Sequence, residues 1–344
     1  MKLIVDGVIE TLQNGGGCTV YFDEILSFYQ KENKPLQFIR YKDAHHNIGL
    51  DGKETTVEMR VARFQERWRD VPTDSLSRDS VFHSTHYRLP VNKNAHCVIT
   101  TVHDFTYELF RKGAAQWMHS WQKNRAIKGS DGVICVSNNT AEDLLRYCPI
   151  DESKIQVIHN GVSSVYRQLE DIAKTNEVVF VGARGWYKNF GLAVDALAKR
   201  NDLTLSIVGG GALTAEEVQM LDAKLPERYK HMGRVTDEEL NHLYNRAHCL
   251  LYPSSYEGFG IPVIEAMSAG CAVIAVNKSS IPEVAGNAGL LIPEASVDYI
   301  VSALQDLDNS VRMSRAIQDG LLQAKKFSWE KCYNETYNFY KKSN

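Results

Sequence analysis

The chain has 344 residues and a formal net charge of −3, with 44% hydrophobic and 24% charged residues. This length suits two domains of about 100–200 residues, each large enough to bury its own core. The composition is ordinary for a globular protein. The near-neutral charge excludes a strong overall attraction to nucleic acid or anionic membrane, so any basic surface must be local.

Targeting and redox signals are few. Met1-Lys2 leads into only Leu3-Ile4-Val5 before Asp6, which does not fit a signal peptide. No apolar run approaches the ~20 residues that a membrane-spanning helix needs. The seven cysteines are scattered and lack C-x-x-C spacing, which favours reduced thiols. We therefore expect a cytoplasmic protein, which lies on the membrane surface if it meets a membrane at all.

The first half of the chain alternates between apolar runs, which predict buried strands, and residues at helical spacing. Between them, residues 42–55 are polar and predict a loop, and residues 163–176 predict an interdomain linker. The expected strands cover 2–9, 36–41, 81–84, 97–102, 132–136 and 155–158, and the expected helices include 18–31 and 138–147.

Two further segments, 57–69 and 105–128, combine aromatic residues with cations. In the first, apolar residues including Phe64 recur at helical spacing, and the second carries Trp117 and Trp121 among lysines and arginines. We expect amphipathic helices in both. Each could pack its apolar stripe on the domain core, or bind an anionic lipid, a membrane interface or the acceptor. The sequence leaves these alternatives open.

A second alternation of strands and helices begins near residue 178. The expected strands cover 178–181, 203–208 and 271–276, and the expected helices cover 190–199, 214–225, 237–247 and 296–307. Two such runs predict an α/β protein with two Rossmann-like, doubly wound parallel-sheet domains. Ligands of these sheets bind at the carboxyl ends of the strands, so we expect the site in a cleft where the two domains face each other.

The stretch 250–276 is the most informative part of the chain. An apolar strand leads through a glycine-rich turn into a helix whose first position fits Pro262. The free N–H groups at this helix start, beside glycines that admit a close ligand, form a ready phosphate site. Glu257 and Glu265 flank that site and can accept hydrogen bonds from paired hydroxyls. A phosphate between two such acids describes a nucleoside diphosphate sugar.

This string, with its Glu257-x7-Glu265 pattern, resembles the retaining glycosyltransferases of family 4, which have the two-domain GT-B fold. The resemblance implies that Glu257 contacts the transferred sugar and that Glu265 binds the ribose diol. It also implies that backbone groups of the intervening turn contact the sugar hydroxyls and the phosphate. The residues concerned are Gly258, Phe259, Gly260 and Ile261.

The same resemblance implies a domain organisation. We expect an amino-terminal, acceptor-side domain over residues 1–163 and a nucleotide-sugar-binding domain over residues 164–326. The last segment, 327–344, is then expected to form a helix that packs back on the first domain.

Motifs after other strands match the same family. Lys188, in Gly182-x5-Lys188, fits the lysine that neutralises the leaving diphosphate. The family's arginine position holds Ala183, so Arg184, one residue later, departs from the pattern. By the resemblance, Arg184 is expected to be the second catalytic cation that neutralises the leaving diphosphate. His103 follows a buried strand and fits the histidine that contacts the donor sugar.

Three further positions are expected to contribute backbone contacts to the donor. Gly16 and Gly17, after the first strand, resemble the family's glycine loop on the diphosphate and acceptor side. Val235, after a later strand, is expected to border the nucleobase pocket.

These features predict a retaining hexosyltransferase that acts on a glycan or lipid-linked acceptor in surface polysaccharide assembly. GDP-mannose is the first choice of donor, followed by UDP-glucose or UDP-N-acetylglucosamine. No cofactor and no nucleic acid are expected. No metal is expected either: glycosyltransferases of the other major fold hold a divalent ion with an Asp-x-Asp motif, and the only such triplet here is Asp306-Leu307-Asp308. It ends a late helix, where solvated carboxylates are common. A sugar-nucleotide epimerase of similar fold and a catalytically silent sugar-nucleotide scaffold remain as alternatives.

Overall fold

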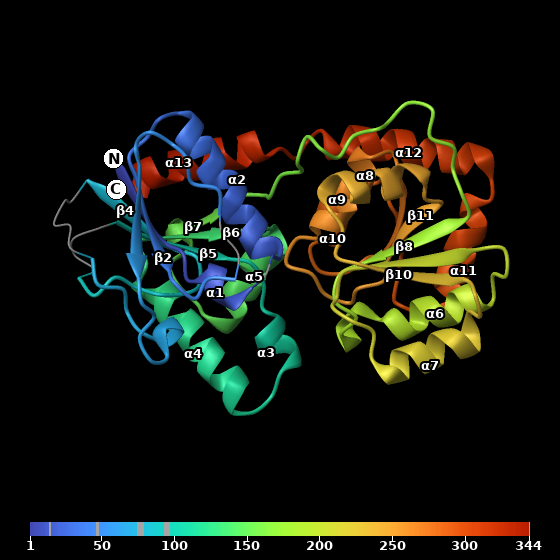
Figure 1. The fold of residues 1–344 in the computed structure, drawn as a ribbon, viewed down its shortest axis with the longest axis horizontal. Coiled ribbons are helices and arrows are strands. Elements are labelled where there is room, and N and C mark those ends of the chain that lie inside the picture. Colours follow the sequence, from blue (N-terminus) through green and yellow to red (C-terminus); the bar gives the residue numbers. More distant parts are fainter. Residues whose placement is uncertain (14, 46–47, 74–78, 93–96, 344) are drawn as a thin grey trace. The chain divides into compact units, whose positions relative to one another are not determined.

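The computed structural model describes residues 1–13, 15–45, 48–73, 79–92 and 97–343. The chain divides into two compact units, each with its own sheet and covering helices (Figure 1). Unit 1 comprises Met1–Gly161 together with Trp329–Asn344, and unit 2 comprises Val162–Ser328. No helix in the described ranges is both long and apolar enough to cross a bilayer.

Among the described residues, unit 1 contains a parallel sheet of seven strands in the order β3-β2-β1-β4-β5-β6-β7. Its central strands β4, β5 and β6 are buried along their whole length, as expected for a parallel sheet covered on both faces. The strands are β1 (Lys2–Asp6), β2 (Leu36–Tyr41), β3 (Thr55–Arg60), β4 (Ser80–Ser84), β5 (Cys97–Val102), β6 (Gly132–Cys135) and β7 (Ile155–Val157).

The helices of unit 1 come from both ends of the chain. They are α1 (Ile9–Leu12), α2 (Gly17–Lys31), α3 (Thr106–Phe110), α4 (Ala114–Gly129), α5 (Asn138–Tyr147) and α13 (Trp329–Ser343). The late helix α13 packs against α2, where the ring of Tyr333 stacks on Phe28 with centroids 5.6 Å apart. On the same helix, the Tyr340 hydroxyl lies 2.6 Å from Nδ1 of the buried His83.

Unit 2 contains, within the described residues, a parallel sheet of six strands in the order β10-β9-β8-β11-β12-β13. The strands are β8 (Glu177–Val181), β9 (Thr204–Val208), β10 (Tyr229–Gly233), β11 (Cys249–Tyr252), β12 (Ala272–Val276) and β13 (Leu290–Ile292). The helices are α6 (Phe190–Ala198), α7 (Ala215–Lys224), α8 (Asp237–Arg246), α9 (Ile261–Ser268), α10 (Ile281–Ala285), α11 (Val297–Leu307) and α12 (Ser310–Ala324). The prediction of two parallel-sheet α/β domains is therefore confirmed.

The helix predicted over 57–69 is wrong. Thr55–Arg60 forms the edge strand β3, which pairs in parallel with β2, and only Glu66–Trp68 makes a short 3-10 turn. The apolar residues Val57, Met59 and Val61 also recur at a spacing of two, and the β-branched residues at the start of this segment favour a strand. The segment 105–128 is helical but is divided into α3 and α4 around Gly113, whose φ is +88°.

Other differences are smaller. The first strand ends at Asp6, and Ile9–Leu12 turns into α1 instead of extending the strand to residue 9. The linker predicted over 163–176 has little regular structure but lies on unit 2. There, Asn241 Oδ1 accepts a hydrogen bond from the Arg167 amide at 3.0 Å, and Asn245 Oδ1 accepts one from the Leu169 amide at 2.7 Å.

Candidate active site

The loops after β8 and β11 form the core of the candidate site in unit 2. These strands are neighbours, but the chain continues from β8 toward β9 on one side and from β11 toward β12 on the other. Such a switch point opens a crevice at the carboxyl ends of the strands. The side-chain amide of Asn189 ties the two loops together, because it donates to the Pro253 carbonyl and to Ser255 Oγ, each at 2.7 Å.

Lys188 and Glu257 meet at this switch point as an ion pair, with side chains that are only 11% and 13% exposed. The Tyr252 hydroxyl at the end of β11 lies 3.2 Å from Lys188 Nζ. Burial alone would lower the pKa of Lys188, but the neighbouring Glu257 carboxylate and Tyr252 hydroxyl outweigh burial and hold this pKa above its ordinary value. Lys188 is therefore a fixed cation at neutral pH.

The turn between Glu257 and α9 is built around its backbone. Ser279 Oγ accepts a hydrogen bond from the Glu257 amide at 2.9 Å, and Ser280 Oγ lies 2.9 Å from the carbonyl oxygens of both Glu257 and Phe259. Gly260 has a φ of +98°, and a Cβ there would come within 2.7 Å of the Ile281 side chain. Only glycine fits such a position without strain.

Of the remaining residues of this turn, Phe259 is buried in the core and Ile261 belongs to the helix α9. The Phe259 ring is buried against Phe327, so it is the backbone of this residue that can face a ligand. Ile261 begins α9, so Pro262 is the second residue of the helix and not, as predicted, the first, although it still lies in the first turn. Gly258 lies between Glu257 and Phe259 in the same turn.

Glu265 lies in the middle of α9 among tyrosine side chains. The Tyr244 hydroxyl is 3.5 Å from Glu265 Oε2, and Tyr166, whose hydroxyl donates to Asp237 at 3.0 Å, packs against Tyr244. Although the residue as a whole is partly exposed, its carboxyl group is enclosed. Burial, reinforced by the negative charge of Asp237, raises the pKa of the Glu265 carboxyl to about 8.

Arg184 lies in the same unit but has a different set of partners. Its Nε donates to Glu217 on α7 at 2.9 Å, and Nη1 donates to the Gly209 carbonyl at 3.0 Å. Nη2 donates to the carbonyl oxygens of Gly211 and Ala212. The side chain is 4% exposed. Arg184 thus holds the glycine turn after β9. Of the two predicted cations, only Lys188 pairs with Glu257.

Val235 lies beside this turn, at the carboxyl end of β10. The Gly209 amide donates to the Gly233 carbonyl at 2.7 Å, so the β9 and β10 loops adjoin. Gly211 and Gly233 have φ values of +74° and +63°, and a Cβ added to either residue would meet no atom within 4 Å. These backbones can therefore be approached closely. Val235 is partly buried and precedes Thr236, the N-cap of α8.

The site residues predicted in unit 1 lie at the carboxyl edge of its sheet. Gly16 is the exposed N-cap of α2, and Gly17 is the exposed first residue of that helix. His103 follows β5, where its ring meets Tyr21 edge-on at 5.2 Å. Its buried Nε2 has no hydrogen-bond partner among the described residues. Burial lowers the pKa of His103 to about 4, so the ring is neutral at pH 7.

His103 lines a pocket of about 200 Å³ that lies wholly within unit 1. Sequence reasoning missed Arg67 and His119, which line the same pocket from the loop after β3 and from α4. Arg67 lies in the segment predicted to be helical, and its position in the sequence does not indicate a role in a binding site. His83 and His86 lie at the end of β4 and directly after it. Only His86 reaches the pocket, because His83 is fully buried between Thr101 and Tyr340.

Family models match both units. The model for glycosyl transferases group 1 matches residues 165–319, and the model for Glycosyltransferase Family 4 matches residues 79–164. Together they cover more than two thirds of the chain. The chain therefore belongs to the group 1, family 4 glycosyltransferases, and its two parallel-sheet units are those of the GT-B fold, as predicted.

Similar proteins of this family include O-antigen mannosyltransferases. The chain is 29% identical over 287 residues to the O-antigen chain mannosyltransferase B of Escherichia coli, covering 77% of this chain and 74% of that protein. It is also 29% identical over 230 residues to the O-antigen chain mannosyltransferase RfbU of Salmonella typhimurium, covering 65% and 64%.

Solved structures resemble the fold over nearly the whole chain. Sucrose-phosphate synthase from Thermosynechococcus elongatus superimposes with a TM-score of 0.77 at 17% identity, covering 99% of both chains. HepE of Anabaena in complex with UDP gives a TM-score of 0.74 at 16% identity, covering 98% of this chain and 99% of that one. At these identities the likeness concerns the fold alone.

Proposed function

We propose that this glycosyltransferase moves a hexose from a nucleoside diphosphate sugar to a glycan or lipid-linked acceptor, with retention of anomeric configuration. The observation that carries the proposal is the Lys188–Glu257 pair at the switch point of unit 2, next to the N-terminus of α9. A fixed cation, helix N-terminal amides and a hydroxyl-accepting carboxylate at one switch point suit a sugar diphosphate.

The roles follow from where charge develops. Breaking the glycosyl phosphate bond places negative charge on the diphosphate, and Lys188 with the amides of Gly258, Gly260 and Ile261 stabilises it. Glu257 accepts a hydrogen bond from the transferred sugar, and Glu265 accepts those of the ribose diol. Arg184 acts indirectly, because its bonds hold the turn at Gly209–Ala212 in shape.

The remaining donor contacts are assigned on resemblance and position together. His103 contacts the sugar from unit 1, and Gly16 and Gly17 present backbone to the diphosphate or acceptor. Val235 borders the nucleobase. In the retaining step, the acceptor hydroxyl attacks from the face that the diphosphate leaves, and a leaving phosphate oxygen takes its proton.

The reaction is proposed to need no divalent metal, because Lys188 and the helix amides supply the positive charge. Within the described ranges, no three His, Cys, Asp or Glu side chains are grouped as metal ligands. Turnover that is unchanged by EDTA would support this part of the proposal. Turnover that EDTA abolishes and Mg²⁺ or Mn²⁺ restores would contradict it.

GDP-mannose is the preferred donor and surface polysaccharide assembly the preferred process. The support comes from the two O-antigen mannosyltransferases to which the chain is similar. UDP-glucose and UDP-N-acetylglucosamine are second, since HepE has been solved with UDP. Thermal unfolding with each sugar nucleotide provides the test, because a ligand that binds only the folded state raises its melting temperature. If no sugar nucleotide raised it, the proposed function would fail.

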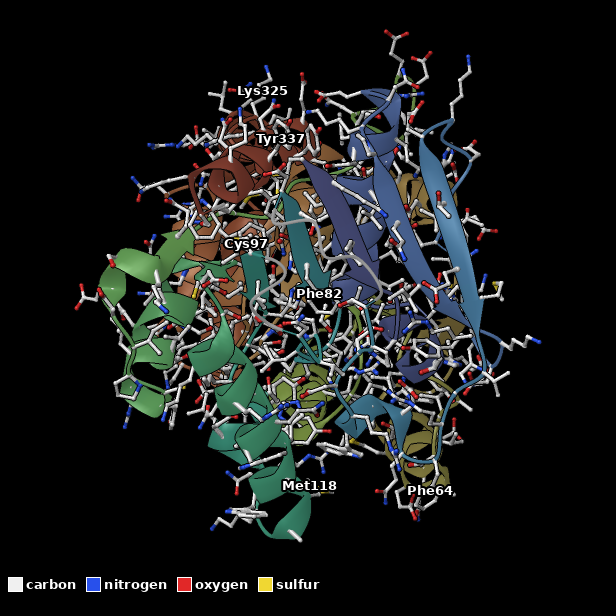
Figure 2. The ribbon with its side chains drawn as sticks, turned by 90° about the vertical axis from the view of Figure 1, so that its left-hand side faces the viewer. Phe64, Phe82, Cys97, Met118, Lys325 and Tyr337 are labelled. Atoms are coloured by element: carbon white, nitrogen blue, oxygen red, sulfur yellow. The ribbon has the colours of Figure 1, made fainter. Side chains whose placement is uncertain are left out.

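Membrane-surface contact is proposed through one end of unit 1. Phe64, Trp117 and Trp121 expose 81%, 69% and 50% of their surface there, and the exposed Arg111 and Lys112 precede the helix that carries the two tryptophans. Met118 on α4 and Phe64 point outward at the same end of the view in Figure 2. The Arg125–Asp70 ion pair joins α4 to the loop that carries Phe64. Aromatic side chains with nearby cations suit an anionic bilayer interface.

Vesicle flotation tests this contact. The protein should float with anionic phosphatidylglycerol vesicles, and the double variant Trp117→Ser, Trp121→Ser should remain in the aqueous fraction. Equal flotation of both proteins would contradict the assignment.

A further inference from the structure

The pocket of unit 1 is lined by two chemically different groups of side chains. One group comprises Asp104, Cys18 and His103. The other comprises Arg67, His86 and His119, which contact one another through His86. A ligand that fills this pocket should therefore carry two kinds of polar group, one suited to the acidic side chain and one suited to the arginine and the histidines.

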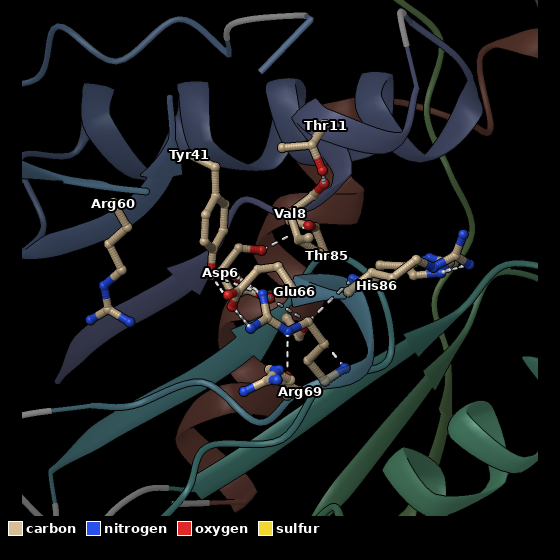
Figure 3. Close-up of polar contacts among 12 residues, drawn as sticks. Asp6, Val8, Thr11, Tyr41, Arg60, Glu66, Arg69, Thr85 and His86 are labelled. Atoms are coloured by element: carbon tan, nitrogen blue, oxygen red, sulfur yellow. Dashed lines mark hydrogen bonds and ion pairs between the residues drawn. The ribbon is translucent and has the colours of Figure 1, made fainter. Parts of the chain in front are cut away.

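The backbone next to Arg67 is held by a buried polar network around Glu66 and Asp6 (Figure 3). Glu66 accepts hydrogen bonds from Arg63 and pairs with Arg88, which is 1% exposed. Arg88 in turn contacts Asp6 at 3.0 Å, at the end of β1. From the other side, the Gln122 side-chain amide on α4 donates to the Arg67 carbonyl. The backbone at Arg67 is thus fixed before any ligand binds.

The guanidinium of Arg67 has no acidic partner. Within the described parts of the chain, no carboxylate lies within ion-pair distance of it, and its buried Nε has no hydrogen-bond acceptor. Its Nη2 lies 3.3 Å from His86 Nε2. Arginine can only donate, so His86 accepts there and carries its own proton on Nδ1. A partly buried cation without a counter-ion is costly, and a bound anion would remove that cost.

The two histidines add donors without adding charge. Burial, together with the positive charge of Arg67, lowers the pKa of His86 to about 3. Burial lowers that of His119 to about 4. Each neutral ring retains one N–H, and His119 is held by stacking on Tyr107 with centroids 3.9 Å apart. The buried Nδ1 of His119 has no partner among the described residues.

We propose that the acceptor carries a phosphate group and that Arg67, with His86 and His119, binds that phosphate in the unit 1 pocket. The reacting sugar of the acceptor then lies beside Asp104 and His103. This proposal rests on the proposed function, since it identifies the chemistry of the acceptor in the same transfer. Arginine and uncharged N–H donors are well suited to phosphate oxygens.

Two sources could supply such a group: a soluble sugar phosphate or a polyprenyl phosphate-linked sugar. Both present a phosphate next to a hexose. The first binding experiment therefore uses wild-type protein whose unit 2 site is saturated with GDP or UDP. Calorimetry then measures the binding of α-mannose 1-phosphate, free mannose and inorganic phosphate. The phosphate-bearing ligands should bind and free mannose should not. Free mannose that binds as tightly as mannose 1-phosphate would overturn the proposal without any variant.

The source is then resolved by competition. Phosphatidylcholine vesicles that carry a polyprenyl diphosphate-linked sugar should displace mannose 1-phosphate if the natural acceptor is lipid-linked. Plain phosphatidylcholine vesicles serve as the blank. Displacement assigns a lipid-linked acceptor, and a lack of displacement assigns a soluble one. Both outcomes support a phosphate site.

The variant Arg67→Gln tests the residue itself. Loss of the guanidinium should weaken phosphate binding about ten-fold or more, and Arg67→Lys should restore part of it. The matched control is Arg146→Gln, which removes an equal charge from an exposed position of the same unit. Unchanged phosphate affinity in Arg67→Gln would refute the assignment. If that variant does not fold, the phosphate affinity of Arg67→Lys and the wild-type comparison of mannose 1-phosphate with free mannose still test the proposal.

Failure of this inference differs from failure of the proposed function. Slow hydrolysis of the donor in water needs the unit 2 residues but no acceptor. Donor hydrolysis that persists in Arg67→Gln while phosphate binding falls supports both proposals. Donor hydrolysis with no phosphate binding by the wild type overturns only the acceptor inference. Absence of any donor binding overturns the proposed function.

Discussion

Lys188 combines near-complete burial with a positive charge because Glu257 and Tyr252 both contact it. The sequence predicted Lys188 and Glu257 from separate motifs 69 residues apart, and the structure joins them. Spacing could not have predicted this contact, which depends on β8 and β11 being neighbours. Nor could it reveal that the bonds of Arg184 are taken up by the glycine turn.

Replacing Lys188 by Ala should lower kcat about 100- to 1,000-fold, the usual effect of removing one group that stabilises a developing anion. The KM for the acceptor should change little, because the proposed acceptor site lies in unit 1. Steady-state kinetics measure both, with Lys199→Ala, an exposed lysine on the same unit, as control. Full turnover in Lys188→Ala would remove the role assigned to it.

Glu265 links stability to pH. Its carboxyl pKa is about 8 in the folded chain and 4.5 when unperturbed, so between these values the folded state binds more protons than the unfolded state. Stability from this group is therefore fully present below pH 4.5 and is lost as pH rises toward 8, by up to about 1.4 kcal/mol per pH unit. The Glu265→Gln variant has no carboxyl at this position, so its stability should not fall for this reason as the pH rises.

Urea unfolding of unit 2 at several pH values tests the linkage. Glu265→Gln should be more stable than wild type at pH 8 and nearly equal at pH 5. The same variant should bind nucleoside diphosphate less tightly if the ribose role is correct. A wild-type-like pH dependence in the variant would contradict the pKa assignment.

At the scale of elements, the turn after β9 shows what glycine contributes. Gly210 and Gly211 share a φ of +74°, but a Cβ at Gly210 would lie 2.5 Å from Arg184 Nη1 and 2.6 Å from the Gly182 carbonyl, whereas one at Gly211 meets nothing within 4 Å. Each Ala substitution incurs about 1 kcal/mol of backbone strain. Gly210→Ala should lose a further 1–3 kcal/mol or so by steric overlap.

Thermal unfolding of Gly210→Ala and Gly211→Ala measures this difference directly, since the two changes are matched in backbone conformation. Gly210→Ala should also weaken nucleotide binding, because the turn it distorts adjoins Val235. Equal melting temperatures would show that Arg184 can move aside without loss.

The buried network at the end of β1 and β2 in unit 1 makes a second element-scale prediction. Arg88→Met leaves Asp6 and Glu66 buried without their shared cation. Desolvation already raises the pKa of Asp6 despite Arg88. We expect a loss of about 3–5 kcal/mol in unfolding free energy, measured by urea unfolding. Arg69→Met, on the exposed side of the same loop, should lose far less.

The elements also show where sequence reasoning succeeds. Long apolar runs such as Cys97–Val102 were predicted to the residue, because a strand buried on both faces has few alternatives. The edge strand β3 was missed, since its apolar residues fit two periodicities. The short strands β10 and β13 and the helix α12 were missed too. β10 has a mixed polar composition, β13 has only three residues, and the helical spacing of the apolar residues in α12 was not used.

At the scale of the whole molecule, unit 2 interrupts unit 1 in sequence. The chain leaves unit 1 at Gly161 and returns to it at Trp329. Helix α13 buries Trp329, Tyr333, Phe339 and Tyr340, among others, against unit 1. At about 1.5–3 kcal/mol for each large apolar side chain, this burial is comparable to the net stability of a domain.

Ending the chain after Ser328 should therefore unfold or greatly destabilise unit 1 while unit 2 keeps its transition. Hydrogen exchange read by mass spectrometry can follow the units separately: β5 and β6 should lose protection, and β11 and β12 should keep it. Removing only residues from 342 onward should leave both units protected. Loss of protection throughout unit 2 would contradict the independence of its core.

This order of segments has a consequence for synthesis on the ribosome. Every residue of unit 2 emerges before the helix that completes unit 1, so the second unit along the chain can finish folding first. Until Tyr340 emerges, the sheet of unit 1 exposes the apolar surface that α13 later covers. A nascent chain stalled before that point should bind chaperones through the exposed apolar surface of residues 1–161.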